Sequence, residues 1–235
     1  MSAQVLIFGR HAVISALKNK DRKVSKILVT KDNLAELSFV EKNKVQVVDR
    51  KEIEKHVGKD AVHQGFLLFA EALNVFSLED VIDICENKPN ARVLILDQVT
   101  DPQNVGAIIR SCVAFGVDAL IVQDKNTPQE NGTIIKASAG TYEYIKIARV
   151  TNLSRAIEAL QKNSFWVIGM DGYAKTTLKD FKPTGKIAIV MGSEGKGMRR
   201  LVEENCDEMI RLETSDKVES LNVSVATSIV LYNLQ

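Results

Sequence analysis

The sequence predicts an α/β protein with two domains, and three observations support this prediction. Short apolar runs of strand length alternate with helical spacings along most of the chain. A polar stretch over residues 73–90 interrupts this alternation. Beyond it, glycine-rich or polar junctions follow apolar runs, as at the ends of buried parallel strands. We therefore expect a small domain over residues 1–72, a linker over 73–90 and a larger domain over 91–235.

Composition narrows the class of protein. The chain has 235 residues, of which 45% are hydrophobic, and no apolar run approaches the ~20 residues of a membrane-spanning helix. The start of the chain lacks the basic-then-apolar order of a signal peptide. Its three cysteines form no CxxC pair, which argues against a disulfide framework and a zinc site. We expect a cytoplasmic protein that uses neither a metal nor a membrane.

Charge is distributed unevenly between the two parts. Residues 1–72 carry 13 Lys and Arg against 9 Asp and Glu, whereas residues 73–235 carry 18 against 21. A basic first segment fits contact with RNA, although an ordinary solvated surface explains a difference of this size equally well.

The first 72 residues alternate between the two periodicities. They predict helices over 10–19, 32–42 and 50–57, and strands over 24–30, 45–48 and 66–70. Asp32 is the candidate cap of the second helix. Together these elements predict a small α/β sandwich.

The larger domain repeats the alternation. It predicts strands over 93–96, 119–122, 144–150, 165–170, 187–191 and 208–212, and helices over 104–115, 134–139, 152–163, 198–206 and 221–234. The last helix is apolar on nearly every face, so it must be buried within the domain or against a second subunit.

The first junction, residues 97–110, contains a candidate cation for binding. Arg110 stands in an otherwise apolar helix. Because arginine is rarely buried without a partner, Arg110 either extends to the surface or reaches an anion near the strand ends. Asn104 is placed to cap the helix, and Gly106 would let another backbone approach closely.

The second junction, residues 192–197, is a glycine loop. The spacing of Gly192, Gly195 and Gly197 matches no phosphate-binding loop, and Glu194 would repel a phosphate. A ligand without phosphates, held by backbone groups, fits this composition better. A tight turn without any ligand would fit it as well.

The third junction, residues 216–224, gathers short polar side chains before the final helix. Ser220 is a candidate N-cap, whereas Asn222 inside the first turn has a weaker structural reason. All three histidines lie in the first 72 residues, which argues against a Ser–His–Asp hydrolase. The residues alone therefore predict an α/β enzyme or binding module with a ligand site at the strand ends.

Taken together, the three junctions resemble the signature of the SPOUT class of RNA methyltransferases, in its ribose 2′-O-methylating, TrmH-like branch. The motifs are LDQVTDPQNVGAIIRSCVAFG, IVMGSEGKGMRRLVEENCD and SLNVSVATSIVLYNL, which together cover roughly residues 91–235. The earlier motifs GRHAVISAL and HQGFLLF resemble the small RNA-binding domain, similar to ribosomal protein L30e, that precedes the catalytic domain in enzymes methylating guanosine of bacterial 23S rRNA.

This resemblance implies methyl transfer from S-adenosylmethionine to a ribose 2′-hydroxyl of 23S rRNA. It also implies a homodimer and a parallel-sheet SPOUT domain with a C-terminal trefoil knot. By position, the cofactor contacts would be the backbones of Gly192, Leu212 and Leu221. The polar catalytic set of the family falls on Asn104, Arg110, Glu194, Ser220 and Asn222.

Two roles follow from these positions. A guanidinium stays protonated in proteins, so we expect Arg110 to grip an RNA phosphate and stabilise charge on the reacting oxygen rather than to take the proton. Arg10 and His11, in a Gly-Arg-His turn, are candidate RNA contacts. His11 has the alternative of serving only as the first residue of a helix.

One departure from the family pattern concerns the cofactor. The family has Ile-Pro-Met where this chain has Leu212-Glu213-Thr214, and loss of the proline frees the loop to move. The missing proline therefore puts the affinity for the cofactor in question.

Methylation of tRNA or of the thiostrepton site of rRNA remains an alternative function. A non-catalytic RNA-binding protein is the alternative of another class. A dinucleotide-binding enzyme is disfavoured by the glycine spacing.

Overall fold

The computed structural model describes residues 4–215, 217–218 and 220–234. These residues form two compact units, the first made of those up to 74 and of 129–143, and the second of 75–128 and of those from 144 onward. The chain therefore passes between the units three times, where we expected one linker. None of the helices in the described residues is long and apolar enough to cross a membrane.

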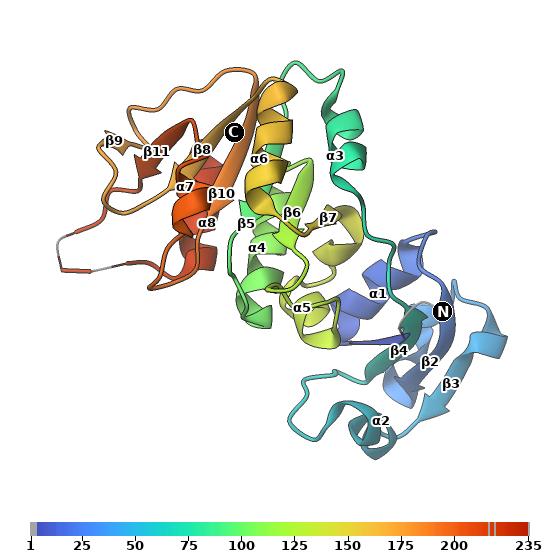
Figure 1. The fold of residues 1–235 in the computed structure, drawn as a ribbon. Helices are drawn as coiled ribbons and strands as arrows, with labels where there is room; N and C mark the ends of the chain where they lie inside the picture. The colour runs from blue at the N-terminus through green and yellow to red at the C-terminus, as the bar shows by residue number, and fades with distance from the viewer. Residues whose placement is uncertain (1–3, 216, 219, 235) are drawn as a thin grey trace. The chain divides into compact units, whose positions relative to one another are not determined.

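The first unit is built on a four-stranded mixed sheet. Its strands are β1 (Gln4–Phe8), β2 (Val24–Thr30), β3 (Val45–Val48) and β4 (Phe66–Glu71). They lie in the order β1-β4-β2-β3, with β4 antiparallel to both neighbours and β3 parallel to β2. The helices are α1 (Arg10–Lys18), α2 (Arg50–Val57) and α5 (Gly132–Ala137) (Figure 1). The expected small α/β fold is present, and it has an additional first strand, β1.

The helix expected over residues 32–42 is wrong. The structure has two 3₁₀ helices there, η1 (Lys31–Leu37) and η2 (Lys42–Lys44), and the residue before η1 is Thr30. Leu37 is the only buried residue within these two 3₁₀ helices. Without an apolar stripe to pack against the sheet, an α-helix of this length has little to stabilise it.

The second unit is built on a seven-stranded sheet in which each strand pairs in parallel with its neighbours. Its strands are β5 (Arg92–Leu96), β6 (Ala119–Gln123), β7 (Lys146–Val150), β8 (Phe165–Met170), β9 (Thr176–Thr177), β10 (Lys186–Met191) and β11 (Glu208–Arg211). They lie in the order β7-β6-β5-β10-β8-β11-β9 (Figure 1). This confirms the predicted α/β class with a parallel sheet. The trefoil knot stays a prediction.

Helices cover this sheet and bury its central strands. They are α3 (Leu78–Cys85), α4 (Pro102–Ala114), α6 (Leu153–Lys162), α7 (Arg200–Glu203) and α8 (Val223–Asn233); a further 3₁₀ helix, η3 (Thr141–Tyr144), follows α5. The apolar side chains of β5, β6 and β10 are almost completely buried, which explains their continuous apolar sequence. Helix α3 lies in the segment expected to be a linker, yet its Val81 and Cys85 belong to the core of this unit.

The register of the sheet positions the functional loops. Leu96 at the end of β5 is paired with Met191 at the end of β10. The next residues, Asp97 and Gly192, therefore begin two of the three expected junctions at the same edge of the sheet. This is the edge where open parallel sheets bind their ligands.

Candidate functional site

The start of α4 differs from the expectation that Asn104 caps it. Asp101 is the N-cap, and its carboxylate accepts from the N–H groups of Gln103 and Asn104, with Pro102 in the first turn. Proline is favoured there because the missing N–H would have had no helical partner. The amide of Asn104 is thus released from capping and is available for other contacts.

The start of α8 also differs from expectation, because its N-cap is Asn222 and not Ser220. Oδ1 of Asn222 accepts from the Ser224 N–H at 3.0 Å and from the Ser224 hydroxyl at 2.6 Å. The helix begins two residues later than the apolar pattern suggests. With Oδ1 committed to the helix, the Nδ2 group of Asn222 points outward as a donor.

This outward amide joins the three junctions. Nδ2 of Asn222 donates to Oδ1 of Asn104 at 3.0 Å and to Oε2 of Glu194 at 3.2 Å. Asn104 comes from the first junction, Glu194 from the second and Asn222 from the third. Residues up to 118 positions apart in the sequence therefore form one hydrogen-bonded cluster, which we call the amide cluster.

The second junction folds into a tight hairpin. The N–H of Ser193 donates to the Gly197 carbonyl at 3.0 Å, and the N–H of Gly197 donates back to Ser193 at 2.9 Å. A Cβ added to Gly192 would lie 2.4 Å from the Gly197 carbonyl carbon and 2.5 Å from the Met198 nitrogen. Only glycine therefore allows the chain to close on itself here.

Sequence reasoning missed the pair that anchors this hairpin. Asp97 is fully buried, and its carboxylate accepts from the backbone N–H and from Nε of Arg199, each at 2.8 Å. A buried carboxylate requires such partners. The available signal was an acidic residue directly after a buried strand, but its partner lies 102 positions away.

A cavity of about 400 Å³ opens beside the hairpin. Five of the residues expected at the site line it: Gly192, Glu194, Leu212, Ser220 and Leu221. Its remaining walls are mainly apolar or glycine residues, together with Asp171, Tyr173 and Thr214. Glu213, at the position of the family's proline, forms an exposed ion pair with Lys179 at 2.6 Å. The cavity can receive a partly apolar ligand and offer it backbone polar groups.

Arg110 stands apart from the amide cluster. It lies exposed on α4, and within the described residues no hydrogen bond or ion pair holds it. Arg10 and His11 lie in the first unit, both exposed, and Nε of Arg10 pairs with Glu36 at 2.7 Å. The structure thus joins Asn104, Glu194 and Asn222, brings Glu194 and Ser220 to the cavity, and leaves Arg110 free to meet a ligand.

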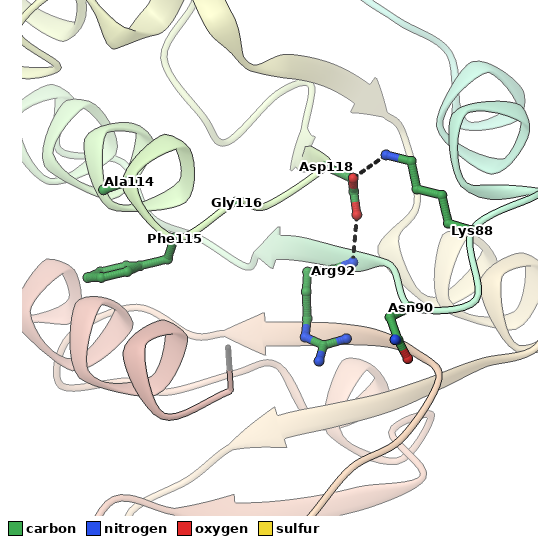
Figure 2. A pocket seen from close by; sticks show the side chains of 7 residues that line it. All are labelled: Lys88, Asn90, Arg92, Ala114, Phe115, Gly116 and Asp118. Atoms are coloured by element: carbon green, nitrogen blue, oxygen red, sulfur yellow. Dashed lines mark hydrogen bonds and ion pairs between the residues drawn. The ribbon is translucent and has the colours of Figure 1, made fainter.

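A second cavity, of about 540 Å³, lies at the opposite end of the strands. Figure 2 shows Lys88 and Asp118 turned toward each other, with the Asp118 carboxylate accepting from Nζ of Lys88 and from the Arg92 backbone N–H. The Arg92 guanidinium donates to the carbonyls of Gly185 and Leu234. These groups hold together the amino-terminal ends of the strands. The residues expected at the ligand site do not line this cavity.

The three cysteines are free and poorly suited to nucleophilic chemistry. Burial raises the pKa of Cys206 to about 12, with help from the nearby acids Asp207 and Glu203. Burial also raises the pKa values of the Cys85 and Cys112 thiols. All three therefore stay protonated at neutral pH, and a thiolate mechanism is disfavoured.

Comparison with known proteins identifies the family. Residues 91–232 match the SpoU rRNA Methylase family, and residues 6–76 match the family described as RNA 2′-O ribose methyltransferase substrate binding. The chain is 38% identical over 234 residues to the 23S rRNA (guanosine-2′-O-)-methyltransferase RlmB of Escherichia coli K12, covering 97% of this chain and 96% of that protein. The protein of the same name from Haemophilus influenzae is 38% identical over 237 residues, with the same coverage.

Solved structures share the fold. The SpoU methyltransferase AviRb of Streptomyces viridochromogenes, in complex with AdoMet, superposes with a TM-score of 0.83 at 18% identity, covering 98% of this chain and 89% of that one. An AdoMet-bound rRNA methyltransferase of Sinorhizobium meliloti gives 0.82 at 21% identity, covering 98% and 86%. From the match over residues 91–232 and the identity to RlmB, the chain belongs to the SpoU rRNA methylase family.

Proposed function

We propose that this protein transfers a methyl group from S-adenosylmethionine to the ribose 2′-hydroxyl of a guanosine in 23S rRNA. The observation that carries the proposal is the amide cluster, which joins the three family motifs beside the cavity. The 38% identity to RlmB over nearly the whole chain supports the substrate. Ribosomal RNA lies in the cytoplasm, and we propose that the protein acts there.

The cavity fits the proposed cofactor. Gly192 lets the hairpin close and lines the cavity, and Leu212 and Leu221 also line it. We assign these three backbones to cofactor binding. When bound, S-adenosylmethionine supplies a methyl group on a positively charged sulfur, which makes that methyl electrophilic. The pair Glu213–Lys179 holds the loop where the family has proline, though a pair this exposed adds little stability because solvent screens it.

The polar residues have separate tasks in this proposal. A ribose hydroxyl is a weak nucleophile at neutral pH, so it must be held in place, and its proton must pass to the neighbouring phosphate or to a water as the methyl is transferred. The exposed guanidinium of Arg110 binds the neighbouring phosphate and stabilises the charge that develops on the oxygen. Glu194 and Asn222 orient the Asn104 amide, because both donors of Asn222 are already used, and Asn104 and Ser220 hold the ribose. Such alignment is worth about 7–11 kcal/mol in intramolecular reactions.

The first unit selects the RNA in this proposal. Residues 6–76, of which all but the last two lie in this unit, match a substrate-binding family, and Arg10 and His11 are exposed there. RNA is recognised through its shape, its unpaired bases and its 2′-hydroxyls, which a separate binding unit can read while the second unit performs the chemistry.

We further propose a homodimer formed through α8. This helix buries Val223, Val230 and Leu231 in its own unit, yet leaves Val225 47% and Tyr232 66% exposed. These two side chains lie seven positions apart, on one helix face. Sedimentation should give twice the 26.0 kDa mass of the chain, and Val225→Asp should halve it. An identical mass for both proteins would contradict the proposal.

The proposed function is tested by supplying labelled S-adenosylmethionine with two RNAs, a transcript of 23S rRNA domain V and bulk tRNA, followed by nuclease digestion. Label on a ribose of the 23S transcript is the expected result. Label on tRNA would keep the chemistry and overturn the substrate. No label on either RNA, together with no cofactor binding, would favour the non-catalytic RNA-binding alternative.

A further inference from the structure

Residues 129–143 fall within the methylase family match, but they fold with the first unit. Two glycines permit this close packing. A Cβ at Gly132 would lie 2.6 Å from the Leu6 carbonyl oxygen on β1. A Cβ at Gly140, whose φ is +88°, would lie 2.8 Å from the His11 carbonyl oxygen on α1. Larger residues would push the segment away from these elements.

A buried ion network fixes the same segment. Arg22, from the turn before β2, pairs with both Glu130 and Glu143, and the side chains of all three are almost completely buried. Glu130 also accepts from the Leu73 N–H at 2.8 Å, and Glu143 from the Asn19 amide at 2.8 Å. The position of α5 on the first unit is therefore set at both ends by charged contacts.

Helix α5 carries one lysine, Lys136, to the Gly-Arg-His turn. Its ammonium donates to Oε1 of Gln64 at 3.1 Å, and the same oxygen accepts from the Arg10 N–H at 3.1 Å. The lysine lies across Gly9, where a Cβ would come within 2.5 Å of Nζ. Lys136 thus lies beside Arg10 and His11, the candidate RNA contacts.

Lys136 has no counter-charge among the residues that the structure describes. It is half-buried, and no ion pair among the described residues includes it. Burial lowers the pKa of its ammonium, which indicates incomplete solvation of the charge. An ammonium has three N–H donors, and Gln64 takes one. The remaining donors suit an anion with several acceptor oxygens.

We propose that Lys136 binds a backbone phosphate of the RNA and acts with Arg10 and His11 as part of the substrate-binding surface. The methylase part of the sequence thereby supplies a residue to the RNA-binding unit. This inference rests on the proposed function, because it takes RNA to be the substrate.

The test measures the affinity of the full chain for the domain V transcript across a range of salt concentrations. Each phosphate contact contributes about 0.7–0.9 to the slope of log K against log salt. Lys136→Met should lower the slope by about that amount and weaken binding about fivefold at 0.15 M salt. Lys136→Arg should keep most of the slope. Lys162→Met, an exposed lysine at the end of α6, is the control and should leave the slope unchanged.

A second variant keeps the test decisive if Lys136→Met fails to fold. Gln64→Glu places a carboxylate beside Lys136 and should lower the slope without removing the lysine. If Lys136→Met and Gln64→Glu both fold and both keep the wild-type slope, the inference is overturned. It is also overturned if either variant loses affinity while its salt slope stays at the wild-type value. Cofactor affinity should not change in either variant. A wild-type protein that neither binds nor methylates the transcript would instead overturn the proposed function.

Discussion

At the scale of single residues, Asn222 serves two purposes through the two ends of one amide. Its oxygen caps α8, and its nitrogen donates to Asn104 and Glu194. Aspartate would retain the capping oxygen but lose both donors, whereas alanine would lose everything. The two substitutions therefore separate the structural role from the role at the site.

Asn222→Ala should lower the free energy of unfolding by about 1 kcal/mol, because the cap is lost. Asn222→Asp should keep wild-type stability but lower methyl transfer about tenfold or more, because it places a second negative charge against Glu194. Urea unfolding followed by circular dichroism and single-turnover methyl transfer measure the two effects. Full activity in Asn222→Asp would show that the amide cluster does not contribute to the reaction.

Arg110 differs from Asn222, because no hydrogen bond or ion pair within the described residues holds it. Its substitution by alanine should therefore leave stability unchanged. Methyl transfer should fall about 10²–10³-fold, the usual loss when one charge-stabilising group is removed. Cofactor affinity, measured by calorimetry, should stay within about twofold. A loss of cofactor binding would place Arg110 in a structural role instead.

At the scale of elements, the hairpin after β10 joins the sheet to the cavity. Its closure depends on Gly192, and the buried Asp97–Arg199 pair anchors the residues that follow it. The strand supplies rigidity and the hairpin supplies backbone polar groups. A ligand held by backbone atoms needs such a rigid support, because a flexible loop would lose entropy on binding.

Gly192→Ala should weaken binding of S-adenosylmethionine about tenfold or more, since overpacking of this kind costs about 1–3 kcal/mol. Gly172→Ala is the matched control. Gly172 lines the same cavity, has no left-handed backbone conformation, and a Cβ there would meet nothing within 4 Å. Calorimetric titration compares the two. Equal affinities in both variants would show that the hairpin does not bind the cofactor.

Local patterns predicted most elements but few of the contacts between them. The strands β2, β3 and β8 and the helix α2 have the predicted bounds, because their apolar spacing and caps are local signals. Strand β1 was not predicted, since its five residues depend on pairing with β4, 59 to 67 positions away. The caps at Asp101 and Asn222 were misplaced by a few residues, because several neighbouring polar residues can cap a helix.

At the scale of the whole molecule, the division of the sequence differs from the division of the structure. Residues 129–143 lie between two strands of the parallel sheet in the sequence, yet they complete the first unit. Arg22, Glu130 and Glu143 form the buried centre of this arrangement. Composition and periodicity do not report such a pairing, because its members are more than 100 positions apart.

This network predicts an unusual dependence of stability on pH. Burial raises the pKa of Glu130 above its ordinary value of 4.5, although Arg22 opposes the shift. A carboxyl with a raised pKa in the folded state stabilises the fold fully below its unfolded pKa, and this contribution is lost as pH rises through the folded pKa. Glu130→Gln removes the titration and leaves Arg22 paired with Glu143. Its free energy of unfolding should therefore decline less than that of the wild type as pH rises above about 4.5.

Arg22→Met should destabilise the first unit by about 3–5 kcal/mol at neutral pH, since two buried carboxylates lose their cation. Hydrogen exchange of the β1 and α5 amides measures both effects within the unit. Identical pH slopes in Glu130→Gln and the wild type would show that Glu130 does not carry this dependence.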